Sequence, residues 1–173
     1  MIQNQINPKE ILGSDIFSKI DISQKFENNI FSIFLNGEDV TSKIGGHKVS
    51  LNVSEYAKKP EIRKFVYKLL RKSSGSNSII VDGRDIGTVV FPDADFKFFL
   101  FALPEIRAQR RHKEINDESV KIESIEKEIL IRDDIDSNRD IAPLKKAKDA
   151  FGIDVSYLSI EEVFEKILQK III

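Results

Sequence analysis

Apolar residues recur along much of this chain at the three- and four-residue spacing of amphipathic helices. The clearest case begins at Pro60, where Ile62, Phe65, Val66, Leu69 and Leu70 fall on one face and Gly75 lies just beyond the last turn. The expected helices are, in chain order, a segment after Pro8, one from Pro60 to Gly75, one from Pro104, one from about Ile122 to Asn138, and one after the capping box Ser159-Ile160-Glu161-Glu162.

Short apolar runs of a different kind separate these helices and predict strands. Ile30–Leu35 precedes Asn36-Gly37, a strong tight-turn signal, so a return strand through Val40 and Thr41 would complete a hairpin. The other expected strands are Ile79-Ile80-Val81, which ends in Asp82-Gly83, the run from Phe96 to Leu103, which only Lys97 interrupts, and a segment around Phe151–Val155.

Strands that alternate with helices predict an α/β fold with a mostly parallel sheet, because wholly apolar strands are typical of sheets covered on both faces. Ligands of such sheets bind beyond the carboxyl ends of the strands. Asp82 follows an apolar strand and so lies where chemistry is expected. A plain turn residue before Gly83 is an equally good interpretation of Asp82.

Composition excludes several classes of site. The 173 residues contain no Cys, which rules out disulfides, thiolate zinc sites and a cysteine nucleophile within them, and 2 His, too few for a three-histidine metal site. His47, beside Gly45-Gly46, is expected in a loop, and His112 is expected to be exposed on a helix rich in Arg and Lys. Neither has an evident Ser/Asp partner, so triad chemistry is set aside. Net charge is −1, and no apolar run approaches the roughly 20 residues of a membrane helix. We therefore expect a cytoplasmic, single-domain protein without a signal peptide, a membrane partner or a nucleic-acid partner.

Arginine is scarce in this chain, which makes its positions informative. Of the 27 basic residues, 8 are Arg and 19 are Lys. A guanidinium group offers a planar, bidentate fork that suits phosphate esters. Seven arginines lie in or beside the segments described above: Arg63, Arg84, Arg107, Arg110, Arg111, Arg132 and Arg139. A solvated helix face explains Arg107, Arg110 and Arg111 equally well, and a surface salt-bridge row explains Arg132, Asp136 and Arg139.

Several motifs in register resemble cytidylate kinases. They are Leu35-Asn36-Gly37-Glu38-Asp39-Val40-Thr41, Val49-Ser50-Leu51-Asn52-Val53-Ser54, Pro60-Glu61-Ile62-Arg63, Ile80-Val81-Asp82-Gly83-Arg84-Asp85-Ile86-Gly87-Thr88-Val89-Val90-Phe91-Pro92-Asp93-Ala94, Pro104-Glu105-Ile106-Arg107-Ala108-Gln109-Arg110-Arg111 and Arg132-Asp133-Asp134-Ile135-Asp136-Ser137-Asn138-Arg139. The similarity extends from about Phe31 to the final helix. It is much more specific than a lone glycine motif.

This resemblance implies a nucleoside monophosphate kinase of the P-loop class, with a parallel sheet flanked by helices, that transfers the γ-phosphoryl group of ATP to CMP or dCMP. A CMP-binding insert at 30–76 and a lid region at 104–140 would belong to it. By this resemblance, Ser54, Arg63 and Asp85 contact the cytosine, and Arg84 and Arg139 hold the monophosphate. Arg132 and Asp136 border the phosphate and the sugar.

The same resemblance assigns Arg107, Arg110 and Arg111 to the lid, where arginines close over the phosphoryl group in transfer. Asp82 would organise Mg²⁺ through its waters, and ATP is the co-substrate. The expected partners are therefore small nucleotides, and the expected state is a monomer. CMP, dCMP and UMP are not distinguished by the sequence.

Three features depart from the family pattern. Ile135 and Ser137 stand where further arginines are usual, the Asn116–Glu118 linker is short, and the 173 residues contain no Gly-x-x-x-x-Gly-Lys-Ser/Thr. That loop supplies the backbone cradle and the Lys for the β- and γ-phosphates. We therefore expect a kinase that lacks its first strand and its phosphate loop. It would also lack an Asp and an Arg that contact the acceptor nucleotide in the family. We expect it to have very low activity alone, or to be completed by a missing N-terminal fragment.

Two other hypotheses remain. A non-catalytic nucleotide-binding protein would keep the CMP pocket without turning over ATP. A decaying gene product would unfold without cooperativity. RNA binding is the least favoured, because no basic stripe is interleaved with aromatic residues.

Overall fold

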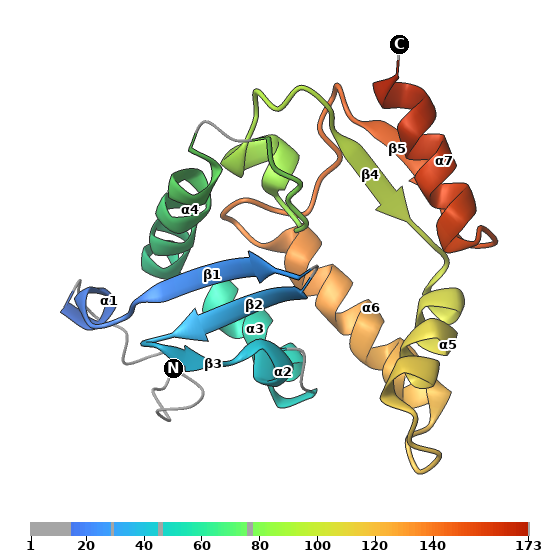
Figure 1. The fold of residues 1–173 in the computed structure, drawn as a ribbon. Helices are drawn as coiled ribbons and strands as arrows, with labels where there is room; N and C mark the ends of the chain where they lie inside the picture. The colour runs from blue at the N-terminus through green and yellow to red at the C-terminus, as the bar shows by residue number, and fades with distance from the viewer. Residues whose placement is uncertain (1–14, 29, 45–46, 76–77, 173) are drawn as a thin grey trace. The chain divides into compact units, whose positions relative to one another are not determined.

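The computed structural model describes residues 15–28, 30–44, 47–75 and 78–172 (Figure 1). The chain divides into two compact units, residues 1–79 and 80–173. Each unit is described here by itself.

The first unit holds a three-stranded antiparallel sheet in the order β1-β2-β3. Its strands are β1 (Ile22–Glu27), β2 (Ile30–Leu35) and β3 (Glu38–Asp39). The turn between β2 and β3 uses Asn36 and Gly37, with φ angles of 51° and 82°. Both are left-handed, as a two-residue hairpin turn requires, and this is why Asn-Gly stands there.

Four helices complete the first unit: α1 (Asp15–Ser18), α2 (Thr41–Ile44), α3 (His47–Ala57) and α4 (Pro60–Ser74). α4 starts with Pro60 in its first turn, where a missing N–H costs nothing, and ends at Gly75, which has a φ of 47°. Its expected apolar face is confirmed in part: Ile62 is 9% exposed and Phe65 stacks on Phe17 at 4.9 Å between ring centroids, whereas Val66 is 39% exposed.

The second unit is organised around a parallel pair of strands, β4 (Phe98–Phe101) and β5 (Phe151–Asp154). Phe98 pairs with Phe151, and their rings lie 5.8 Å apart. After β5, the Ser159 hydroxyl and the Glu162 carboxylate cap each other's backbone N–H, as a capping box does. This fixes the start of α7 (Ile160–Ile171).

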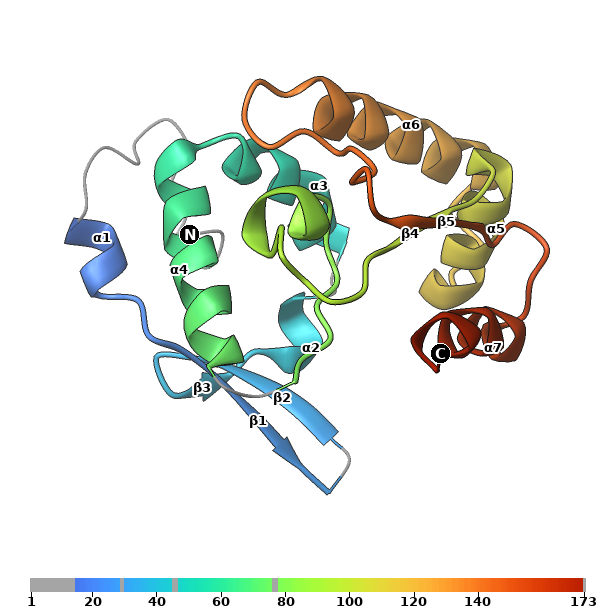
Figure 2. The ribbon, with the colours of Figure 1, turned by 90° about the horizontal axis from the view of Figure 1, so that it is seen from above.

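Two longer helices and a short π-helical turn carry the polar residues of the second unit. α5 (Pro104–Ile115) packs against α6 (Ile122–Asn138), and they lie side by side in Figure 1 and Figure 2. The contact buries Ala108 and Ile125, which are 0% and 4% exposed. The π-turn η2 (Ile86–Val90) forms because the Asp85 carbonyl accepts hydrogen bonds from both Val89 and Val90.

The helical pattern predicted α4, α6 and the start of α7 correctly, and β2 has the expected bounds. The expected strand at Ile79–Val81 is wrong: the segment forms no ladder, and no described strand lies beside it to pair with. The helix expected after Pro8 is seen only as α1, since residues 1–14 lie outside the described part of the chain.

Three finer expectations also need correction. The return strand is Glu38–Asp39, not Val40–Thr41, because the Asp39 carboxylate accepts the Thr41 N–H and turns the chain into α2. His47 opens α3 instead of lying in a loop. The α/β class is confirmed, but a parallel arrangement holds only for β4 and β5. Among the described residues, no helix is both long and apolar enough to span a membrane.

Candidate functional site

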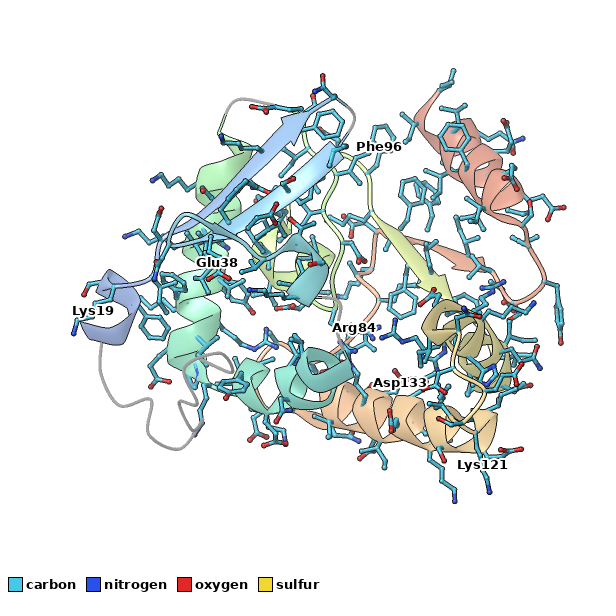
Figure 3. The ribbon with its side chains drawn as sticks, turned by 60° about the horizontal axis from the view of Figure 1, so that its bottom comes forward. Lys19, Glu38, Arg84, Phe96, Lys121 and Asp133 are labelled. Atoms are coloured by element: carbon cyan, nitrogen blue, oxygen red, sulfur yellow. The ribbon has the colours of Figure 1, made fainter. Side chains whose placement is uncertain are left out.

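A buried carboxylate, Asp136 on the last turn of α6, gathers three arginines in the second unit. Asp136 is 3% exposed. Its Oδ1 lies 3.2 Å from Arg139 Nη1, and its Oδ2 lies 3.4 Å from Arg84 Nε and 3.8 Å from Arg132 Nε. Arg132 and Asp136 face one another because residues four apart in a helix share a face. Arg139 directly follows the last residue of α6, Asn138, with an extended backbone. Arg84 joins them from the segment that leads into η2, and is labelled in Figure 3.

A second buried carboxylate belongs to this cluster. Asp85 is 7% exposed, and its Oδ1 lies 3.7 Å from Arg139 Nη2. Arg139 is also held from behind, because its Nε donates to the Ala142 carbonyl at 2.7 Å. The Leu144 N–H donates to the Asp136 carbonyl at 2.7 Å, so the chain folds back over the end of α6. Arg139 is thus fixed between two carboxylates and a backbone oxygen.

The charges of this cluster leave a positive excess. Three guanidinium groups face two carboxylates at the distances given above. Burial, and then the nearby charge of Arg84, lower the pKa of Arg132. Its Nε, like that of Arg107, is buried without a hydrogen bond to a described protein atom. An arrangement of this kind is stabilised by a bound anion, and a phosphate ester matches its charge and its donor-only groups.

The three arginines on α5 are each engaged by protein groups. Arg107 Nη2 lies 2.5 Å from the Asp133 carboxylate on α6, which Figure 3 labels. Arg111 pairs with Glu114 at 3.0 Å. Arg110 Nη2 instead donates to backbone carbonyls beyond β5, those of Val155 at 2.7 Å, Ser156 at 3.1 Å and Leu158 at 3.3 Å. Arg110 thus connects α5 to the chain that follows β5.

Two of the residues assigned to cytosine lie in the first unit. The Arg63 side chain donates to the Ala57 carbonyl and to the Tyr67 hydroxyl, both at 2.6 Å. The bond to Ala57 joins α4 to the end of α3, whereas the bond to Tyr67 lies within α4. Ser54 lies on α3, but its side chain is outside the described part of the structure. The structure therefore groups Asp85 with the arginines of the second unit, and the cytosine assignments of Ser54 and Arg63 stay predictions.

The metal assignment rests on Asp82 alone. Asp82 is exposed and not part of a strand. Among the residues that the structure describes, no group of three or more His, Cys, Asp or Glu side chains is placed to hold a metal ion. One carboxylate still suits Mg²⁺, which keeps several waters and takes further oxygens from phosphates.

Two polar residues near the strand ends were missed by the sequence analysis. Lys97 is 9% exposed, and the only signal for it is its position as the one charge in an apolar run. Ser156 is 4% exposed, and its hydroxyl accepts the Leu103 N–H and donates to Asp154. A single serine after a strand gives no comparable signal.

The fold and the arginine cluster are those of an α/β protein equipped to bind an anionic ligand. Comparison with known proteins identifies the family to which it belongs. Residues 1–172 match the cytidylate kinase family, so the chain belongs to that family. The resemblance inferred from the motifs is therefore confirmed, and so is the expectation of a phosphotransferase at the level of the family.

Individual relatives agree with this membership. The chain is 48% identical to a cytidylate kinase of Thermosipho melanesiensis over 146 residues, which are 83% of the chain and 66% of the relative. It is 44% identical to one of Fervidobacterium nodosum over 165 residues, 94% of the chain and 74% of the relative. A Clostridium tetani cytidylate kinase is 49% identical over 148 residues, 84% of the chain and 65% of the relative. The chain thus spans about two thirds to three quarters of these relatives' lengths.

Proposed function

We propose that this chain acts in phosphoryl transfer from ATP to CMP or dCMP, and that its own residues bind the acceptor nucleotide. The cluster around Asp136 carries the proposal. It offers an excess of positive charge and only hydrogen-bond donors, apart from two carboxylates that orient them. A nucleoside monophosphate brings a dianionic phosphate that neutralises this excess.

Asp85 adds base recognition to phosphate binding. Its carboxylate lies beside Arg139, at the edge of the phosphate cluster. A carboxylate accepts a hydrogen bond from an exocyclic amine, which cytosine has and uracil lacks. In this proposal Arg84 and Arg139 hold the phosphate, Arg132 and Asp136 border it, and Asp85 selects cytosine. Ser54 and Arg63 are the other two residues that we propose as contacts of the base, on the resemblance to cytidylate kinases alone.

On the donor side of the reaction, Arg107, Arg110 and Arg111 would face the transferring phosphoryl group, and Asp82 would hold Mg²⁺ of the ATP complex through water. Phosphoryl transfer depends on positioning and on charge stabilisation. The 173 residues contain no Gly-x-x-x-x-Gly-Lys-Ser/Thr, so we expect this polypeptide alone to bind CMP and to turn over ATP very slowly.

Calorimetry with CMP, combined with an assay of CMP-dependent ADP formation, tests the proposal. We expect Arg84→Ala and Arg139→Ala to weaken CMP binding by about 10- to 100-fold, the effect of losing one charge-assisted hydrogen bond. Arg71→Ala, an exposed arginine on α4, is the matched control and should bind CMP like the unmodified chain. Failure of the unmodified chain to bind CMP would refute acceptor binding.

A second function is favoured by one specific observation. The arginines of the acceptor site are assembled in a polypeptide whose sequence lacks the phosphate-loop pattern. A nucleotide-binding protein without catalysis would have this combination. Tight CMP binding with no detectable ADP formation supports that function, whereas full CMP-dependent turnover by the 173 residues excludes it.

A further inference from the structure

Lys97 is a buried lysine that follows Phe96, and Phe96 is labelled in Figure 3. Its side chain is 8% exposed. Nζ donates to the Pro92 carbonyl and, at 2.5 Å, to the Asp149 carboxylate. The aliphatic stem lies against Gly87, where a Cβ atom would be only 3.3 Å from Lys97 Cδ. Lys97 therefore contacts two separate segments of the second unit, one that holds Gly87 and Pro92 and one that holds Asp149.

Both segments lead back to the candidate site. The first starts at Asp85 and runs through η2 to Pro92, and the bonds Val89 N to Asp85 O (2.9 Å) and Phe91 N to Ile86 O (2.7 Å) make it a tight turn. The second starts at Arg139, whose Nε holds the Ala142 carbonyl, and ends at Asp149.

Asp85 and Arg139 are themselves paired, at 3.7 Å. The two segments thus form a closed ring, joined at one end by the Asp85–Arg139 pair and at the other end by Lys97.

We propose that Lys97 is a positioning residue, which acts through both segments to hold Asp85 and Arg139 in the geometry that binds the nucleotide. This inference rests on the proposed function of the cluster. Lys97 itself is buried beneath Gly87 and Pro92 and is not offered as a ligand for substrate. A buried cation with hydrogen bonds to two different segments is suited to this task. Loss of either bond would leave a buried polar group unpaired, and this cost favours a single arrangement.

The contacts at each end explain why the effect should be transmitted. Gly87 is inside η2, so the stem of Lys97 limits how η2 moves, and Asp85 supplies the carbonyl on which η2 is built. At the other end, the Asp149 side chain is 64% exposed and depends on Lys97 for its placement. The hydrogen bond from Lys97 is the largest of the effects that lower the pKa of Asp149.

Lys97→Met tests the ammonium while preserving the stem that packs on Gly87. The matched control is Lys43→Met, which removes a lysine paired with Glu38 on the exposed surface of the first unit. The first measurement needs no ligand: nuclear magnetic resonance follows solvent exchange of the Arg139 Nε–H, relative to the backbone N–H of Ala108, a fully buried residue of α5. We expect Lys97→Met to raise this exchange ratio about tenfold and Lys43→Met to leave it unchanged.

The ratio separates positioning from stability. A lysine that only stabilises the unit would alter both exchange rates together, and the ratio would stay constant. Asp149→Asn provides a gentler second variant, since it keeps the ammonium and its bond to Pro92. We expect a smaller rise in the ratio for Asp149→Asn, and near-normal values for Lys97→Arg, which retains a cation on a long stem.

The second measurement is the affinity for CMP by calorimetry, made at a temperature where circular dichroism shows each variant folded. We expect Lys97→Met to weaken binding about tenfold, and Lys43→Met not to change it. Unchanged affinity together with an unchanged exchange ratio would overturn the role of Lys97. If the unmodified chain binds no CMP, the proposed function fails, and the exchange ratio still decides whether Lys97 positions Arg139.

Discussion

At Asp136, one carboxylate holds three guanidinium groups within 4 Å, while its own side chain is only 4% exposed. Ion pairs of this kind contribute little net stability when complete, but they are costly to break, because the remaining charges stay buried without a counterion. Burial, and then the charge of Arg84, lower the pKa of Arg132, and the charge of Asp136 acts in the opposite direction. Asp136 is therefore what permits this concentration of positive charge before a ligand arrives.

Asp136→Asn should consequently destabilise the second unit. We expect a loss of about 2–3 kcal/mol, below the 3–5 kcal/mol of a fully buried pair, because Arg84 and Arg132 retain about 40% of their solvent exposure. Urea unfolding followed by circular dichroism measures the loss, and excess inorganic phosphate should restore part of it by supplying the missing negative charge. Asp140→Asn, an exposed neighbour, is the control; equal stability of the two variants would contradict this account.

The ends of β4 and β5 are linked by polar contacts. The two strands were predicted from the sequence, but these contacts were not. Ser156 accepts the Leu103 N–H at 3.0 Å and donates to Asp154 at 2.6 Å, so one hydroxyl links the exits of both strands. Arg110 on α5 also donates a hydrogen bond to the Val155 carbonyl. The carboxyl ends of these parallel strands are thereby held at fixed positions, which is where ligands of such sheets bind.

The pKa of Asp154 reports on this turn. Hydrogen bonds from the Ser156 hydroxyl, and then from its backbone N–H, lower that pKa below its ordinary value. A lowered pKa means that the stabilisation is complete above the ordinary value and is lost as the pH falls through the lowered one. Ser156→Ala should move the pKa of Asp154 back toward its ordinary value, as measured by a carbon NMR titration of the carboxyl group.

Asp117 provides the internal control for that titration. It accepts the N–H and the hydroxyl of Ser119 in the same arrangement, and its pKa is lowered for the same reasons. Ser156→Ala should leave Asp117 unchanged. If Asp154 also stays unchanged, the Ser156 hydroxyl does not donate to Asp154 in solution.

Local patterns were enough for the elements that depend on local interactions. α6 and α4 follow their apolar spacing and their flanking Pro and Gly, and the Asn36-Gly37 turn follows from two left-handed residues. β1 was missed because Ile22 and Phe26 are separated by Gln24 and Lys25 without a clean alternation, and its pairing with β2 is what makes it a strand. Ile79–Val81 has the composition of a strand and lacks a described partner.

The same distinction applies to the candidate site. Arg132, Asp136 and Arg139 share a helix face, so sequence spacing places them together, and the resemblance to cytidylate kinases added Arg84 and Asp85. Contacts far apart in sequence, such as Lys97 with Asp149 and Arg110 with Val155, follow from tertiary packing and have no signature in spacing. One pattern did point to Lys97, which is the single charge in an apolar run. A lone lysine that is buried in such a run requires hydrogen-bond acceptors.

Across the second unit, several large apolar side chains remain exposed. Ile80 is at full exposure, with a relative value of 104%, while Leu100 and Phe101 on β4 are each 48% exposed. Parallel strands with apolar residues on both faces are normally covered on both sides. Exposed apolar surface of this kind marks a site of association or an aggregation liability, and the expectation of a monomer is still to be tested.

Ile80 allows a direct measurement of whether that surface is covered in solution. A side chain that buries nothing contributes nothing to folding through burial, so Ile80→Ser should leave the urea midpoint of the second unit unchanged. Val90→Ser is the contrasting variant: Val90 is 2% exposed, and losing its methyl groups should cost about 2 kcal/mol.

A comparable loss for Ile80→Ser, growing with protein concentration, would mean that a second copy of the chain covers Ile80. A comparable loss at every concentration would mean that Ile80 packs within its own chain. Because Ile80 lies two residues before Asp82, either result would also place the segment leading to Arg84 and Asp85 under tertiary constraint.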